Sequence, residues 1–420
     1  MNSAKFTRFL IVGLLCCPFV FHGASLVFTL LLLLVWFVEG DLKRKFNFLK
    51  VHPFLFLLPG FYLLFMLGLL YSSNLSFGIQ KAETRLSLLI LPIVLPTLKH
   101  ADWRLNGLWF FSWFIRIATF SSFVCITQGL YHYFEELNAI KAGANILKPV
   151  GYNYFFSSHL TDFIMHPGYY AVYVVMAIFA LLNLMLYKPK NFLKWYNGLA
   201  LIVLLTLLFL SYAKAALIVF VLLSIIFGIQ IAYHKSKWVY LLYGGFMALF
   251  TLLVFYFFVP NTQERIQAIR DVVNTEKLDP TSTESTQARA HTWRGAFAAL
   301  KKSPWIGFGT GDANDELFKS YRELNYTGVL SREYNAHNEY LQTALALGIV
   351  GVVFLMLPFV FSLRYAIKQR NFYLGSWALL TMVVLLFESY LNMQSGSLFV
   401  ALFFSILPFV RFDDAEVFNL

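Results

Sequence analysis

Long apolar runs recur along this chain of 420 residues, and they constrain its fold more than any other feature. An α-helix needs roughly 20 apolar residues to cross the hydrocarbon core of a bilayer, because each residue adds about 1.5 Å. Runs of about that length occupy residues 8–22, 24–38, 53–71, 83–98, 107–131, 165–187, 196–211, 213–233, 238–259, 343–363, 372–391 and 396–410. We therefore predict an all-α polytopic membrane protein with about twelve transmembrane helices.

The composition agrees with this prediction. Apolar residues make up 59% of the chain and charged residues only 13%, whereas soluble domains average about half and a quarter. So few charges could not cover a soluble surface of this size. The formal net charge of +11 is better explained by membrane topology than by nucleic-acid binding, so we expect no nucleic-acid partner.

The lysines and arginines are distributed unevenly between alternate loops, which predicts the orientation of the helices. About half of the 33 basic residues fall near the N terminus and in the segments DLKRKFNFLK, KHADWR, KPKNFLKW, HKSKW, RYAIKQRN and RFDD. Short cytoplasmic loops are enriched in lysine and arginine. The pattern therefore predicts a multi-pass protein with both termini inside the cell.

One outer segment is long and polar, and it divides the chain into three parts. We predict nine transmembrane helices in residues 1–259, a large outer loop with short helices in residues 260–342, and three more helices with a cytoplasmic tail in residues 343–420. Loops of this length are usually functional or disordered. The acidic and basic residues of the loop nearly balance, so the charge rule for short loops does not apply to it.

A helix with a charged residue on its apolar face is predicted within this loop. In ARAHTWRGAFAALKKSP (288–304), Arg289, Trp293 and Phe297 recur at helical spacing, whereas Arg294 points elsewhere. An arginine directed toward an apolar face needs an anionic partner, because an unpaired buried charge costs several kcal/mol. The alternative is an arginine whose head reaches the lipid headgroups.

Other basic residues stand at the outer ends of predicted helices, where the charge rule does not favour them. Lys81 and Arg85 are four residues apart and share a helix face, and Lys214 occupies the tight turn between the runs at 196–211 and 213–233. Arg116 lies within an apolar run, where a charge is costly and functional by default. Such cations could converge on a doubly charged group such as a diphosphate, which arginine binds with two hydrogen bonds.

The segment YNAHNEYLQTALALGIVG (334–351) leads from the loop into the next apolar run. We predict that Asn335 caps a helix whose first turn holds His337, Asn338 and Glu339. A histidine has an unperturbed pKa near 6.5, so His337 could take a proton from a hydroxyl at neutral pH. Asn338 could orient His337 or bind a sugar. The alternative is that both residues only cap the helix at the membrane surface.

Other site chemistries find little support in the sequence. The glycine-rich PWIGFGTGD (304–312) lacks the Lys-Ser/Thr of a P-loop, so we interpret it as a structural turn. The three cysteines lie in apolar runs, and no Cys/His cluster has metal-ligand spacing. We therefore expect neither a metal nor a cofactor. No role follows from the sequence for Arg116, His166 or Glu388.

Two of these segments carry a family resemblance. NAHNEYLQTALALGIVG, preceded by RAHTW and SPWIGFGTGD, resembles the signature of the O-antigen ligase and polymerase family, which also includes bacterial protein O-oligosaccharyltransferases. The resemblance covers chiefly residues 285–365 and the plan of about twelve helices with one large late outer loop. HPGYYAVY (166–173) and ESYLNMQSG (388–396) resemble, more weakly, patterns of Bacteroidetes-type members.

The resemblance implies a GT-C-like glycosyltransferase of lipopolysaccharide biosynthesis in the bacterial inner membrane, with its active site facing the periplasm. Its donor would be a glycan on undecaprenyl diphosphate, used without metal or cofactor. His337 matches the family's proposed catalytic histidine, Arg289 the loop arginine, and Arg85 an outer arginine proposed to hold the diphosphate. Where relatives often show Ser-Arg, this chain has Lys214, which keeps the charge but loses the two-pronged contact.

The resemblance leaves the acceptor open. The acceptor hydroxyl could belong to lipid A core, to another glycan or to a protein serine or threonine, and we favour an O-antigen ligase because the large outer loop falls late in the chain. Membrane lipids are expected neighbours. The alternative is a transporter of lipid-linked oligosaccharides, but this predicts inverted repeats and midplane charges, and only Arg116 fits.

Overall fold

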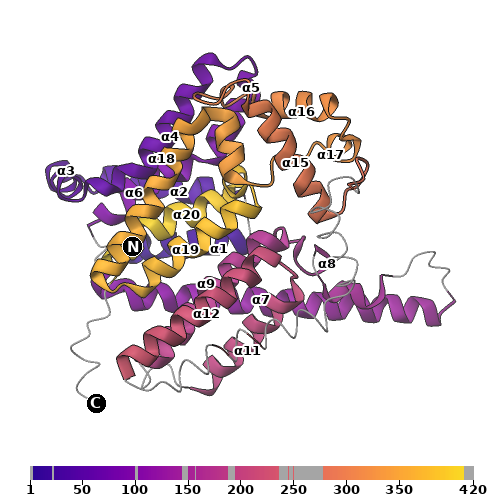
Figure 1. The fold of residues 1–420 in the computed structure, drawn as a ribbon. Helices are drawn as coiled ribbons and strands as arrows, with labels where there is room; N and C mark the ends of the chain where they lie inside the picture. The colour runs from indigo at the N-terminus through magenta and orange to yellow at the C-terminus, as the bar shows by residue number, and fades with distance from the viewer. Residues whose placement is uncertain are drawn as a thin grey trace. The chain divides into compact units, whose positions relative to one another are not determined.

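The computed structural model describes residues 3–20, 23–99, 103–143, 150–156, 158–187, 194–235, 245, 249 and 278–410. Within these ranges the regular structure is entirely helical (Figure 1). The α-helices are α1 (Ser3–Val20), α2 (Ala24–Val38), α3 (Leu42–Val51), α4 (Leu57–Leu67), α5 (Leu75–Thr84), α6 (Leu86–Val94), α7 (Trp103–Lys141), α8 (Ser158–Thr161), α9 (Pro167–Tyr187), α11 (Trp195–Leu210), α12 (Lys214–Lys235), α15 (Ser285–Leu300), α16 (Ala313–Glu323), α17 (Thr327–Ser331), α18 (Glu339–Gln369), α19 (Phe372–Phe387) and α20 (Gln394–Ile406).

Several of these helices could cross a bilayer, which confirms a polytopic helical membrane protein. Five segments of the described chain are long and apolar enough: Pro53–Tyr71, Gly107–Lys141, Pro167–Leu186, Lys214–Ala232 and Glu339–Gln369. The pair α2 and α3, bent by 113°, could add a sixth. The total of about twelve stays a prediction, and most of the run at 238–259 lies outside the described residues.

One predicted run is broken where a charge interrupts it. The sequence suggested a single helix over residues 83–98, but the chain turns at Arg85, which ends α5 and precedes α6. The backbone of Arg85 leaves helical geometry there (φ −98°, ψ 2°). This break separates the polar α5 from the apolar α6, and it places the arginine at the junction of the two helices.

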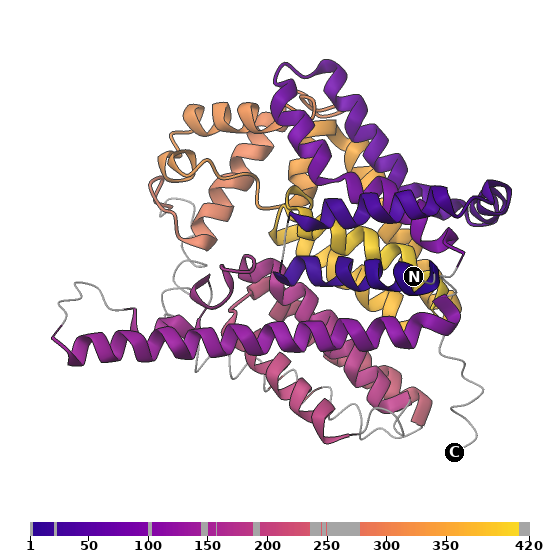
Figure 2. The ribbon, with the colours of Figure 1, turned by 180° about the vertical axis from the view of Figure 1, so that it is seen from behind.

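The described helices fall into two units. The first contains α1, most of α2, and α7 to α12, and there the long α7 packs against α1, α9 and α11. The second contains α3 to α6 and α15 to α20. In the second unit α20 is apolar on every side, and its residues from Ser395 to Ile406 are all buried. It packs on α6 and α19, which makes it a core helix (Figure 2).

A break in α18 is filled by the glycine-rich segment. Gly348 has a backbone conformation (φ 63°, ψ −162°) that strains other residues. Around it the chain 304–309 forms backbone hydrogen bonds with α18: Phe308 N–H to Leu345 O at 2.8 Å, and Ile349 N–H to Pro304 O at 2.9 Å. The glycine-rich segment is therefore a structural turn, which satisfies backbone groups that the break would leave unpaired.

The same segment ties the α15–α16 region to α4 and α5. The Thr310 hydroxyl donates to the carbonyl of Phe65 at 2.6 Å, and the Asp312 carboxylate accepts from the backbone N–H groups of Ser73 and Asn74, both at 2.7 Å. These contacts join segments more than two hundred residues apart in sequence. They fix the position of α5, which carries Lys81.

Helix α15 begins and packs differently from the prediction over 288–304. It starts at Ser285, where the Glu284 side chain caps it, and ends at Leu300. Its buried face consists of small or polar residues, whereas Phe297 of the predicted apolar stripe is 57% exposed. The buried face packs on α16 and α18; a side chain on Gly295 would meet the ring of Tyr321 at 2.5 Å. The buried face of α15 is made mainly of small residues because the helices pack closely there, and a search for large apolar residues at helical spacing does not detect such a face.

Candidate active site

The segment before α18 holds His337 in an unusual backbone conformation. His337 has φ 44°, which is rare for a residue with a side chain and costs of order 1–3 kcal/mol. The Asn335 side chain accepts a hydrogen bond from the His337 N–H at 2.9 Å. Asn335 was predicted to cap the helix, and this is wrong: Asn338 is the cap, and its side chain accepts from the Leu341 N–H at 3.1 Å. The cause is that the helix begins at Glu339, later than the pattern suggested.

The residue before His337 is fixed by two further helices. The Ala336 N–H donates to the Gln342 side chain at 3.1 Å, and the Ala336 carbonyl accepts from the Thr292 hydroxyl of α15 at 3.2 Å. Gln342 in turn donates to Asn314 of α16 at 2.8 Å. These contacts hold the strained backbone, so the imidazole stands on a rigid support although it precedes the helix.

Glu388 brings His337 and Arg289 together. One oxygen of its carboxylate lies 2.7 Å from Nη2 of Arg289, and the other lies 3.5 Å from Nδ1 of His337. The three side chains are 10%, 25% and 29% exposed in the order Glu388, Arg289, His337. The Tyr334 ring meets the imidazole edge-on at 5.2 Å. Arg289 therefore has the anionic partner that its position on the helix requires.

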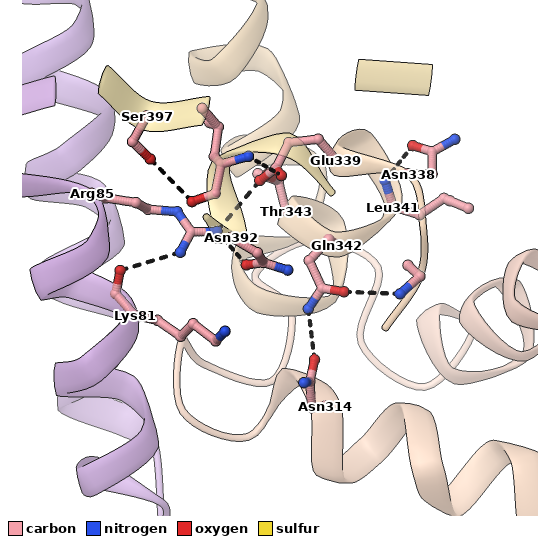
Figure 3. Close-up of polar contacts among 12 residues, drawn as sticks. Lys81, Arg85, Asn314, Asn338, Glu339, Leu341, Gln342, Thr343, Asn392 and Ser397 are labelled. Carbon is pink, nitrogen blue, oxygen red and sulfur yellow. Dashed lines mark hydrogen bonds and ion pairs between the residues drawn. The ribbon is translucent and has the colours of Figure 1, made fainter. Parts of the chain in front are cut away.

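A second charged cluster, formed by Arg85 and Glu339, is buried in the same unit (Figure 3). Arg85 is 2% exposed, and its Nη2 donates to Asn392 at 2.7 Å and lies 3.5 Å from Glu339. Its guanidinium also lies 4.3 Å from the Phe65 ring centroid. The Glu339 carboxylate accepts from the Leu391 N–H at 2.9 Å. Both charges are thus neutralised and hydrogen-bonded, as burial requires.

Lys81 and Arg294 are cations with a different status. Both are half-buried, and among the described residues neither has an ion pair. Burial lowers the pKa of the Lys81 ammonium, the nearby Arg85 lowers it further, and Glu339 opposes both effects. In Figure 3 the Lys81 side chain extends from α5 in the direction of the Gln342–Asn314 pair.

The remaining residues singled out from the sequence belong to the other unit. Lys214 begins α12 of the first unit and is half-buried, and Arg116 and His166 lie in the first unit too. The second unit brings together His337, Arg289, Asn338, Arg85, Lys81 and Arg294 as members of one folded body. In the described ranges no three His, Cys, Asp or Glu side chains are grouped to hold a metal ion.

Two histidines of residues 278–410 differ in exposure. His291 of α15 is 1% exposed, and its Nε2 lies 2.9 Å from the carbonyl of Asp279. Burial lowers the pKa of His291, which favours the neutral ring. His291 therefore holds the segment around Asp279 against α15, and a substrate hydroxyl could not reach its buried ring. His337, with 29% of its side chain exposed, can meet an acceptor.

The structure also shows site residues that the sequence reasoning missed. Glu339, Glu388 and Asn392 all make charged or hydrogen-bonded contacts with predicted site residues. One signal was present for Glu388, since a carboxylate inside the predicted apolar run at 372–391 needs a partner. Nothing in the spacing connected it to residues fifty and a hundred positions earlier.

Comparison with known proteins confirms the resemblance seen in the sequence. A family model described as O-antigen ligase matches residues 199–356. Over these residues, less than half of the chain, the sequence is similar to the O-antigen ligase family. The family match indicates ligase- or polymerase-type glycosyl transfer, and in general terms a lipid-linked glycan and an acceptor as partners. The comparison with curated proteins gives no match.

The segment that matches the O-antigen ligase model, residues 199–356, contains only part of the candidate site. Lys214, Arg289, Arg294, His337 and Asn338 lie inside it. The buried arginine of the α5–α6 junction and the carboxylate that follows α19 lie outside it. The contacts that Arg85 and Glu388 make with residues inside the matched segment are therefore known from the structure and not from the family match.

Proposed function

We propose that the protein is an inner-membrane glycosyltransferase that moves a glycan from an undecaprenyl-diphosphate carrier to an acceptor hydroxyl on the periplasmic side. Its most direct assignment is O-antigen ligase, with lipid A core as the acceptor. The observation that carries the proposal is that His337, two residues before the candidate membrane-spanning α18, and Arg289 of α15 both contact the carboxylate of Glu388. It supports a base and a cation acting side by side in one site.

The reaction divides between these two groups. His337 takes the proton of the acceptor hydroxyl while the hydroxyl oxygen forms a bond to the anomeric carbon of the glycan. The bond from that carbon to the diphosphate oxygen breaks, and its electron pair leaves with the diphosphate. Attack in line with the leaving group inverts the anomeric configuration. Cations stabilise the negative charge that develops on the leaving group.

Arg289 retains capacity for this role. Its Nε donates to the Phe387 carbonyl, its Nη1 to the Ser285 carbonyl and its Nη2 to Glu388. A guanidinium has five N–H groups, so two remain for an anionic ligand. Lys81 and Arg294 supply further positive charge in the proposal, and the amide nitrogen of Asn338 supplies a donor for a sugar hydroxyl.

Arg85 and Lys214 stand differently in the proposal. Arg85 is buried and held by Glu339 and Asn392, which favours a role in positioning the site over direct contact with the diphosphate. A diphosphate contact of Arg85 stays a prediction, and so does that of Lys214. The cytoplasmic termini and the periplasmic orientation also remain predictions from the charge pattern.

A transfer assay tests the function and separates the acceptors. Purified protein in lipid is given undecaprenyl-diphosphate glycan with lipid A core, free glycan or a serine-containing protein, each with and without EDTA. We expect transfer to lipid A core that survives EDTA and inverts the anomeric centre. Transfer only to glycan or to protein would identify a polymerase or an oligosaccharyltransferase. Lipid scrambling without transfer would identify a transporter and contradict the proposal.

His337→Ala is the matched variant for this assay, and His159→Ala, an exposed histidine of the first unit, is its control. We expect His337→Ala to abolish transfer at unchanged protein level and His159→Ala to leave it intact. Normal transfer by His337→Ala would exclude His337 as the base.

A further inference from the structure

The turn that follows α19 is fixed by buried contacts with two other segments. The Glu388 N–H still bonds to the Val384 carbonyl at 3.0 Å, and Glu388 then leaves helical geometry (φ −140°, ψ 142°). Three and four residues on, Leu391 donates to Glu339 and Asn392 accepts from Arg85. The buried pair therefore anchors the far side of this turn, and the turn sets where the Glu388 side chain points.

The Glu388 carboxylate contacts two groups with different roles in the proposed reaction: the cation Arg289 and the base His337. Its strong contact is with the Arg289 guanidinium at 2.7 Å, and its second oxygen lies 3.5 Å from Nδ1 of His337. The 3.5 Å separation is longer than a strong hydrogen bond, so attraction between charges and orientation matter here more than a short bond. A carboxylate on the Nδ1 side leaves Nε2 as the ring nitrogen that can face a substrate.

We propose that Glu388 is a positioning residue for His337. It directs Nδ1–H toward itself, so that Nε2 is the base, and it stabilises the imidazolium that forms when Nε2 takes the acceptor proton. Arg289 limits this stabilisation, because it neutralises part of the carboxylate charge. Glu388 thus links the base, His337, to Arg289, the cation that stabilises the leaving diphosphate. The inference rests on the proposed function, because it assigns His337 the role of general base.

Among the described residues, three other ionisable groups are near His337 or its carboxylate partner in space or in sequence. Tyr334 packs against the imidazole from the preceding loop, Arg289 of α15 holds the same Glu388 carboxylate, and Glu339 two residues later is engaged by Arg85. Removing the Glu388 charge therefore has a definite direction. Without the carboxylate the imidazolium is less stable, so His337 is deprotonated down to lower pH.

Glu388→Gln tests this inference in the full-length protein. We expect kcat to fall about 10- to 100-fold, part of the ~10²–10⁴-fold that general acid–base catalysis contributes, with the donor KM within about twofold of wild type. The acidic limb of the kcat–pH profile should move to lower pH. Glu323→Gln, the same change at an exposed carboxylate paired with Lys302, should alter neither.

A second variant and a second readout separate positioning from packing. Glu388→Asp keeps the charge but lengthens the distance to Nδ1, so its acidic limb should stay near wild type while kcat falls. Carbethoxylation of His337 across pH, followed by peptide mass spectrometry, should show the same shift in Glu388→Gln without reference to turnover. If Glu388→Gln does not accumulate, Glu388→Asp carries the test alone, and wild-type kcat in it overturns the inference.

The failure of this inference differs from failure of the proposed function. Glu388→Gln with wild-type kcat and pH profile, or with lower kcat and an unmoved acidic limb and carbethoxylation profile, overturns the positioning role. Loss of transfer in His337→Ala would leave the function standing in either case. Transfer by His337→Ala would exclude His337 as the base and remove the inference with it, while the transfer activity itself would stand.

Discussion

The buried pair of Arg85 and Glu339 gives the prediction with the largest expected effect on stability. Glu339 has no exposed side-chain surface, and Arg85 is 2% exposed. After replacement of Arg85 with leucine, the hydrogen bonds left to the buried carboxylate within the described part of the chain come from the Leu391 N–H and from the Thr343 hydroxyl, which lies 3.3 Å away. Removing one partner of a buried pair costs about 3–5 kcal/mol, because the other charge stays buried and uncompensated. We expect Arg85→Leu to lose about that much stability.

The double variant Arg85→Leu/Glu339→Gln should recover much of the loss. Replacing both members of a buried ion pair is often close to neutral, so the two substitutions should not add. Thermal unfolding of the single and double variants in detergent, followed by size-exclusion chromatography, measures the order of stability. A double variant no more stable than Arg85→Leu would refute the reasoning.

The same double variant separates two roles for Arg85. If Arg85 only fixes the turn that carries Glu388, transfer should return with stability. If Arg85 binds the diphosphate, stability should return while transfer stays low. Measuring both quantities on one preparation therefore decides between positioning and direct contact.

Two further predictions concern the backbone break and the half-buried lysine. Gly348→Ala should cost about 1–3 kcal/mol, because its Cβ would lie 2.1 Å from the Trp305 carbonyl at a positive φ; Gly375→Ala, whose Cβ would have only an ordinary contact at 3.5 Å, is the matched control, and equal melting temperatures would contradict this. Burial lowers the pKa of Lys81, so its ammonium loses its charge at a lower pH than that of an ordinary lysine. The donor KM should therefore begin to rise at that lower pH, and Lys81→Arg, which stays charged, should remove this rise. A wild-type KM that is flat through that range would contradict the role of Lys81.

The general architecture could be predicted from the sequence because membrane helices carry their signal locally. Apolar runs at 165–187, 196–211 and 213–233 correspond closely to α9, α11 and α12. The run at 83–98 does not, because a window average conceals one arginine whose partner, Glu339, lies far along the chain. Hydropathy cannot report a charge that is neutralised by a distant residue.

The candidate site was predictable in part for a similar reason. His337 and Arg289 were recognised individually, as a histidine at a helix entrance and an arginine on a helix face. What connects them is Glu388, about a hundred residues after Arg289. The role of Asn338 as the cap in place of Asn335 depended on a helix start that residue preferences fix only to within a few positions.

The central claim is that His337 accepts the proton of the attacking hydroxyl, and His337→Gln tests it most directly. Glutamine keeps side-chain polarity but cannot act as a base. Single-turnover transfer from saturating undecaprenyl-diphosphate glycan should be about 10²–10⁴-fold slower in this variant, with donor binding unchanged. A single-turnover rate within a few-fold of wild type would contradict the account.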